Sequence, residues 1–118
     1  MENNRAKGTL GEKLAAKYLR DNGFEILVQN YSPKANFQGG EIDIIARKGD
    51  RIHFVEVKSR STDRFGMGRE AVTVQKQKVI RKLAARYLVE RGLYDTASCC
   101  FDVIEINGDR VEYFFNCF

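Results

Sequence analysis

Hydrophobic positions recur along the chain at two spacings, which predict helices and strands. Residues 10–22 and 72–91 carry apolar side chains every three or four positions, the spacing of one helix face. Alternating apolar and polar residues, or short apolar runs bounded by turn residues, are typical of strands. Five segments have this character: 24–31, 41–46, 52–59, 99–106 and 111–115.

Cap and turn residues mark where these elements end. Thr9 and Glu12 form the capping pattern of a helix that begins one residue after the threonine. Gly23 follows that helix, at the position where a left-handed residue often ends a helix. Gly49-Asp50 is a tight-turn signal between two strand patterns, so residues 41–59 are expected to form a β-hairpin.

The order of these elements predicts an α/β fold. One helix precedes three strands, and a second helix precedes two more, which gives the order α-β-β-β-α-β-β. The third and fourth strands are joined through a helix, which favours a parallel pair with a right-handed crossover. The 118 residues are the length of one domain, expected over residues 9–118, and the polar residues 1–8 are expected to be a flexible N-terminus.

Composition excludes several classes of protein. The hydrophobic and charged fractions, 43% and 31%, are those of an ordinary globular chain. No apolar run reaches the length of a membrane helix, and no basic-then-apolar leader opens the chain, so we expect a cytoplasmic protein without a membrane partner. One histidine and three cysteines do not provide a multi-histidine zinc site or a paired disulfide framework. Carboxylates are therefore the main potential metal ligands.

Acidic residues interrupt both apolar strands of the predicted hairpin. Asp43 lies between two isoleucines, and Glu56 lies between two valines. With a two-residue turn, Asp43 falls opposite Glu56 and Glu41 falls opposite Lys58. Directly opposed side chains have Cβ atoms about 4.5–5.5 Å apart. The register therefore predicts two neighbouring carboxylates on one face of the sheet.

This pair of carboxylates has a functional and a plain interpretation. Two carboxylates this close repel each other unless a cation lies between them, and carboxylate oxygens with retained water suit Mg²⁺. Such a metal lowers the pKa of a bound water and stabilises charge on a phosphate, and Lys58 is placed to contact either. The alternative is a solvated, charged strand face. Acidic residues are depleted from strands, and the flanking isoleucines and valines favour covered strands, where carboxylates need a partner.

These motifs resemble the PD-(D/E)XK superfamily, and more closely the YraN family of small bacterial proteins, which are similar to Holliday-junction resolvases. Gly40 to Ala46 (GEIDIIA) matches the family's G-E-[IL]-D-[LI]-I-A segment. Phe54 to Arg60 (FVEVKSR) matches its F-V-E-V-K-x-R segment. Shorter matches are Gly11-Glu12, Phe65-Gly66 and Phe101-Asp102-Val103.

The resemblance implies a restriction-endonuclease-like fold, a mixed β-sheet flanked by helices, and a set of roles. It implies that Asp43 and Glu56 hold Mg²⁺ or Mn²⁺ together with the backbone carbonyl of Val57, and that Lys58 is catalytic. Glu12 is implied as a helix-borne acidic supplement to the catalytic set, although the local sequence explains it equally well as a capping residue. The superfamily includes inactive binding proteins, so the motif indicates the fold more strongly than the activity.

The net charge of +4 conceals an uneven distribution. Residues 60–92 carry nine Lys and Arg against three acidic residues, a net of +6, and the rest of the chain has a net of −2. A basic loop and helix directly after an acidic hairpin could hold phosphates beside a metal. The candidates for binding nucleic acid, expected to be DNA, are Arg60, Arg64, Arg69, Lys76 and Lys78. For Arg81, Lys82 and Arg91 a solvated helix face is the preferred interpretation.

The remaining candidates have weaker signals. His53 is three residues from Glu56 and is therefore expected on the opposite face of its strand, as a packing or edge residue. Glu41 and Asp102 are accessory candidates, and Asp102 alternatively only ends a loop. The cysteines are expected to pack as small apolar residues. The apolar C-terminal segment YFFNCF could form a homodimer contact or fold onto the core.

Three functional hypotheses follow. The first is a Mg²⁺-dependent endodeoxyribonuclease that hydrolyses phosphodiester bonds in structured or branched DNA. The second is a nucleic-acid-binding adaptor of the same fold that lacks turnover and acts in DNA repair or recombination. The third is an interaction protein whose acidic face is a docking surface. Cleavage of DNA would support the first hypothesis, and salt-dependent DNA binding without cleavage would support the second. The absence of both properties would favour the third.

Overall fold

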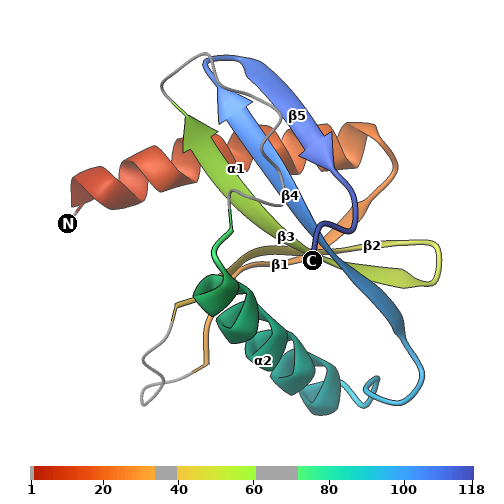
Figure 1. The fold of residues 1–118 in the computed structure, drawn as a ribbon. Coiled ribbons are helices and arrows are strands. Elements are labelled where there is room, and N and C mark those ends of the chain that lie inside the picture. Colours follow the sequence, from red (N-terminus) through yellow and green to blue (C-terminus); the bar gives the residue numbers. More distant parts are fainter. Residues whose placement is uncertain (1, 34–39, 61–71) are drawn as a thin grey trace.

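Five strands form one mixed sheet in the part of the chain that is described, and the two helices lie on different sides of it (Figure 1). The structure is a computed structural model that describes residues 2–33, 40–60 and 72–118. In chain order the elements are α1 (Glu2–Asp21), β1 (Glu25–Tyr31), β2 (Ile42–Lys48), β3 (Arg51–Arg60), α2 (Val74–Glu90), β4 (Ser98–Asn107) and β5 (Arg110–Phe114). The predicted α/β class and element order are confirmed.

Strand order follows chain order, β1-β2-β3-β4-β5. The pairs β1–β2, β2–β3 and β4–β5 are antiparallel, whereas β3 and β4 are parallel. Parallel neighbours need a crossover, and α2 is that crossover, as the element order predicts. The parallel pairing runs from Arg51–Ser98 to Arg60–Asn107, so every residue of β3 pairs with a residue of β4.

The β2–β3 hairpin has the predicted turn and register. Lys48 pairs with Arg51 around Gly49-Asp50, and pairing continues to Ile44 and Val55. Gly49 has a φ of +63°, a left-handed conformation that glycine adopts at little cost. The sequence therefore placed each strand's side chains on the correct faces.

The two ends of α1 differ in how well the sequence predicts them. Gly23, with a φ of +91°, follows the helix, and the amide of Phe24 donates to the carbonyl of Leu19 (2.9 Å). This is the predicted left-handed cap. The predicted capping box is wrong, because α1 begins at Glu2 and Thr9 lies inside the helix. The preceding residues include good helix formers, which extend the helix past Gly8 and Thr9 at a cost of about 1 kcal/mol or less per weak residue.

Gly11 allows α1 to approach β3 closely. A Cβ atom built at this position would lie 2.7 Å from Oγ of Ser59, closer than two such atoms normally approach. Glycine is therefore required by packing, although it is a poor helix former. The close approach brings the next residue, Glu12, to the end of the sheet where the acidic hairpin lies.

Two apolar clusters fill the space between the sheet and the helices. On the α2 side, helix residues pack against Ile45, Phe54 and Val103. On the α1 side, helix residues pack against Ile44, Val55 and Ile104. Neighbouring strand residues thus contribute to opposite clusters, as the alternation of side chains requires.

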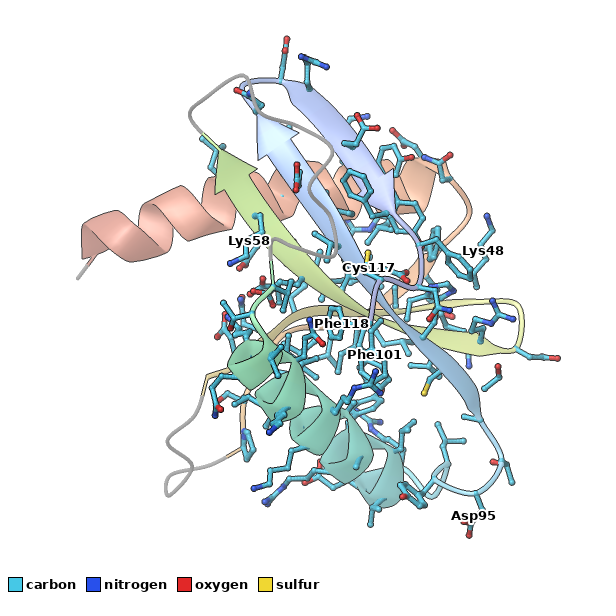
Figure 2. All side chains as sticks on the ribbon, viewed as in Figure 1. Lys48, Lys58, Asp95, Phe101, Cys117 and Phe118 are labelled. Carbon is cyan, nitrogen blue, oxygen red and sulfur yellow. The ribbon has the colours of Figure 1, made fainter. Side chains whose placement is uncertain are left out.

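The C-terminal segment folds back onto the α2-side cluster. The amide of Cys117 donates to the carbonyl of Phe101 (2.7 Å), and the rings of Phe118 and Phe101 stack with centroids 5.4 Å apart. Figure 2 labels these three residues side by side. The structure thus shows the C-terminal segment packed on the core, which is one of the two arrangements predicted for it.

The cysteines are free thiols, with Cys100 and Cys117 buried and Cys99 exposed. Two of the three therefore pack inside, as expected. Neither helix in the described residues is long and apolar enough to cross a membrane.

Candidate functional site

Three acidic side chains from two elements converge at the beginning of β2. One carboxylate oxygen each of Glu12, Glu41 and Asp43 lies within 4.8 Å of the other two. Glu12 comes from α1, and the other two come from the segment that enters β2. Asn30 of β1 joins two of them, because its side-chain amide donates to Glu12 Oε1 (2.9 Å) and to Glu41 Oε2 (3.1 Å). The sheet and α1 together therefore create a concentrated negative charge.

Asp43 also joins the two strands of the hairpin. The regular pairing of β2 with β3 extends to Ile44–Val55, and beyond it the amide of Val57 donates to Asp43 Oδ2 (2.8 Å). Ile45 and Phe54 belong to the α2-side cluster, so Asp43 and Glu56, each two residues further along, face the same side. The expectation that both carboxylates share one face agrees with this register.

Burial and neighbouring charge act together on Asp43. Loss of hydration, followed by the charges of Glu56, Glu12 and Glu41, raises the pKa of its carboxyl group to about 8. The hydrogen bond from the Val57 amide acts in the opposite direction but is too weak to compensate. A carboxyl group in this position holds a proton at neutral pH unless a cation takes the place of that proton.

Glu56 is the most deeply buried carboxylate of the site, with 5% of its surface exposed. One oxygen, Oε2, forms an ion pair with Lys76 Nζ at 3.1 Å. The other, Oε1, is buried and has no hydrogen-bond partner among the described residues. An unpartnered carboxylate oxygen in the interior is costly, so this atom is a vacant acceptor for a cation or donor.

Lys76 lies in the first turn of α2, and the helix cap fixes its position. Thr73 is the N-cap residue, and its hydroxyl oxygen accepts a hydrogen bond from the Lys76 amide (3.1 Å). Burial lowers the pKa of the Lys76 ammonium, but the charges of Glu56, Asp43 and Glu41 outweigh this effect and raise it. The sequence marked Lys76 as a phosphate contact. The structure places it against the carboxylates.

The other predicted residues fall into three groups. Lys58 lies two residues beyond Glu56 on the same face of β3 and is partly buried, and Val57 contacts Asp43 through its amide. Lys78 is exposed on α2, and Arg60 is the last residue of β3. Arg64 and Arg69, with the Phe65-Gly66 match, lie outside the described residues.

Asp102 lies away from this site. It is fully buried on β4, where His53 Nδ1 (2.7 Å), the Tyr113 hydroxyl and the Asn116 amide (2.8 Å) contact its carboxylate. His53 is buried on the face opposite Glu56, which agrees with its expected packing role. Asp102 thus forms a polar network of its own rather than contacting the hairpin carboxylates.

Sequence reasoning missed Asn30. Its φ of +56° is unusual for a residue inside a strand, and asparagine tolerates this conformation better than most residues. A lone asparagine in an apolar strand has no spacing that points to a site, so no signal in the sequence identifies it. The Lys76–Glu56 contact was missed because it depends on how α2 packs against the sheet.

Taken together, the arrangement can hold a divalent cation. Oxygen-rich clusters with negative charge are the ligands that Mg²⁺ and Mn²⁺ prefer. A cation bound beside them gives Glu56 Oε1 a partner and lowers the raised pKa of Asp43. Asn30 fixes the orientation of two of the acidic side chains from outside the cluster. The residues present therefore fit such a metal.

Comparison with known proteins identifies close relatives over nearly the whole chain. The model of the uncharacterised protein family UPF0102 matches residues 11–106. A UPF0102 protein of Clostridioides difficile is 44% identical over 98% of this chain and 99% of its own. One from Acetivibrio thermocellus is 44% identical over 93% of this chain and 85% of its own, and one from Syntrophus aciditrophicus is 46% identical over 95% and 87%. The matched range contains all the carboxylates of the site.

Proposed function

The chain belongs to the uncharacterised protein family UPF0102, to which the YraN proteins belong, and from its site we propose a metal-dependent nuclease. The proposed substrate is structured or branched DNA, and the proposed reaction is hydrolysis of a phosphodiester bond, as in a resolvase. The observation that carries the proposal is the buried Glu56, with its vacant Oε1, facing the same side as Asp43. The resemblance of residues 40–60 to the PD-(D/E)XK superfamily supports the same reaction.

In this proposal Asp43 and Glu56 hold Mg²⁺ with the carbonyl of Val57, and Glu12 and Glu41 add negative charge beside them. When bound, Mg²⁺ supplies a polarised water and neutralises charge on the phosphate. Asn30 keeps Glu12 and Glu41 oriented. Lys58, on the same face of β3 as Glu56, positions the attacking water or stabilises the phosphate. Lys76 holds Glu56 in place through their ion pair.

Contacts to nucleic acid in this proposal come from the basic stretch that follows the hairpin. Lys78 is exposed on α2 and lies two residues after Lys76, the partner of Glu56. Lysine contacts to phosphate position a backbone without reading bases, so recognition of DNA shape is proposed rather than of sequence. Cleavage of a junction on two strands requires two sites, and the proposal therefore includes a homodimer.

A cleavage panel tests this proposal. Duplex, flap, junction and single-stranded DNA are incubated with the protein and Mg²⁺ or Mn²⁺. Asp43→Asn, Glu56→Gln and Lys58→Met are each expected to reduce the cleavage rate by at least about a hundredfold, because each removes a group used in the transition state. Asp95→Asn is the matched control, because Asp95 is exposed in the loop after α2 and lies far from Lys58 (Figure 2). Cleavage by Asp43→Asn at the wild-type rate would refute the assignment.

A second pair of variants tests the metal site without relying on turnover. Asn30→Gly removes the amide that orients Glu12 and Glu41 but tolerates the φ of +56°. It is expected to weaken Mn²⁺ binding, measured by calorimetry, about 10- to 100-fold. Asn116→Gly is the control, because it makes the same change at a φ of +53° outside the site. Metal binding with DNA affinity but no cleavage under any condition would support the adaptor hypothesis instead.

A further inference from the structure

A polar cavity lies on the face of the sheet opposite Glu56. It has a volume of about 490 Å³, and its lining includes Phe24, Lys48, Arg51, His53, Tyr113 and Phe115. This is within the usual range for small-ligand pockets, about 300–1,000 Å³. His53 and Glu56 face opposite sides of β3, and Figure 2 shows Lys48 well separated from Lys58. The cavity is therefore distinct from the candidate metal site.

The walls of the cavity are aromatic. The ring of Phe24 meets those of His53 and Tyr113 edge to face, with centroids 4.9 and 6.0 Å apart. The ring centroids of Phe115 and His53 are 6.1 Å apart. The Phe115 side chain is 52% exposed, which is unusual for a phenylalanine of a folded domain. An exposed aromatic ring at the edge of a cavity gives a planar ligand a surface on which to stack.

Two cations lie at the same cavity, each over one of these rings. Lys48 Nζ is 4.9 Å from the centre of Phe24, and Arg51 Cζ is 5.6 Å from the centre of Phe115. Asp50 also lines the cavity, so the three charged residues give a net of +1. The rings hold the cations at the rim, where they can meet an anionic group of a ligand without crossing the apolar wall.

Two lining residues of the cavity, His53 and Tyr113, belong to a buried polar network. Asp102, fully buried, is contacted by His53 Nδ1, the Tyr113 hydroxyl and the Asn116 amide. Because the carboxylate engages Nδ1, the neutral imidazole carries its proton there and has Nε2 as its remaining acceptor. Such an acceptor suits an N–H or O–H group of a ligand.

Two other uses of this network are disfavoured by its geometry. Cys100 Sγ also contacts His53 Nδ1 (3.1 Å), so thiol and carboxylate share one ring nitrogen, whereas a catalytic triad uses both. Burial and Asp102 raise the pKa of the Cys100 thiol to about 12, which leaves no reactive thiolate. The carboxylate already has three partners, so a metal would have to displace them.

We propose that this cavity binds a small ligand with a planar aromatic ring and an anionic group, the chemical class of the mononucleotides. The ring would stack against the exposed Phe115, the anionic group would meet Arg51 and Lys48, and His53 would accept a hydrogen bond from the ring. The proposal does not depend on nuclease activity, because the two sites share no residue.

Binding of AMP, GMP, CMP and UMP to the full chain, followed by NMR shift changes, tests the proposal. At least one is expected to bind and to shift His53 and its neighbours. Adenosine and ribose 5-phosphate, each lacking one of the two features, are expected to bind at least about tenfold more weakly than AMP. Failure of all four nucleotides to bind at millimolar concentration would overturn the proposal.

Variants separate this cavity from other anion-binding surfaces. Arg51→Gln is expected to weaken nucleotide binding about tenfold, and Phe115→Leu at least about fivefold, with the fold retained because both residues are exposed. Lys82→Gln, an equal change of charge on the exposed part of α2, is expected to have no effect. Equal losses in Arg51→Gln and Lys82→Gln would overturn the assignment. So would loss in Glu56→Gln alone, since that would place the nucleotide at the carboxylates.

Discussion

At the scale of single residues, the candidate site is defined by how many carboxyl groups it brings together. Asp43, Glu12 and Glu41 crowd together, while Glu56 receives one ammonium group from Lys76. In the absence of another cation, this cluster opposes the folded state whenever its carboxyl groups ionise. Such local cost is typical of sites shaped for binding rather than for stability.

The raised pKa of Asp43 makes a prediction about pH. Its carboxyl group has a usual pKa of 3.8 and a folded value of about 8, so the folded chain holds the proton more tightly than the unfolded chain between these values. The stability contributed by this proton is complete below about pH 4 and is lost as the pH rises towards 8. Without added metal, the free energy of unfolding should therefore fall between pH 5 and pH 8.

Asp43→Asn should remove part of this fall, because the amide stays neutral and its oxygen still accepts from Val57. Urea unfolding at pH 5 and pH 8 in a chelator measures it. We expect the variant to lose at least about 1 kcal/mol less than the wild type, given about 1.4 kcal/mol per unit of pKa difference. Asp95→Asn is expected to match the wild type. The same pH dependence in Asp43→Asn and wild type would contradict the assigned pKa.

At the scale of elements, α1 and β3 are held unusually close at one point. Gly11 faces Ser59, and a methyl group at Gly11 would lie 2.7 Å from the serine oxygen. This contact sets the height of α1 above the sheet and therefore the reach of Glu12 towards the hairpin. The packing of α1 against β3 thus determines which residues meet in the site.

A double-mutant cycle tests this contact. Gly11→Ala alone is expected to give less than the gain of about 1 kcal/mol that alanine brings to a helix, because the contact with Ser59 opposes it. In a Ser59→Ala background the oxygen is absent, so Gly11→Ala should recover that gain. The coupling free energy, measured by urea unfolding, is expected to be about 1 kcal/mol. A coupling near zero would mean that Gly11 is not set by this contact.

Elements were predictable from the sequence where the signal was local. The period-two alternation and the Gly49-Asp50 turn were sufficient for the hairpin register, and Gly23 was sufficient for the end of α1. The start of α1 was not predictable from Thr9, because a local capping pattern also occurs inside helices. The contact of Lys76 with Glu56 joins residues twenty positions apart and depends on packing, which no local pattern encodes.

At the scale of the whole molecule, the described part of the basic stretch contains cations that lie over aromatic rings and cations that do not. Arg81 lies over the ring of Phe101, and Arg91 lies over the ring of Tyr87, at 4.8 and 5.2 Å. Both cations are therefore engaged with rings of the core. Lys78 is exposed on the same helix and makes none of these contacts, so it is the better test of a phosphate-binding surface.

The proposed DNA contact predicts a specific salt dependence. Lys78→Gln should weaken binding to junction DNA and reduce the slope of log affinity against log salt by about 1, because one fewer phosphate is neutralised. Lys17→Gln makes the same change of charge on α1, where Lys17 pairs with Asp21, and should leave the slope unchanged. Fluorescence anisotropy over a salt series measures both. A slope that Lys78→Gln leaves unaltered would exclude this lysine from the interface.

The parallel pairing of β3 with β4 has a consequence for how the chain folds. The β2–β3 hairpin joins near neighbours in sequence, whereas β4 must return past the whole of α2 to reach β3. Closing that long loop is slow, because its entropy is lost before the contacts form. We therefore expect Asp43 and Glu56 to face each other in a solvated early hairpin, and to lose their hydration only when α2 and β4 dock in the last steps of folding.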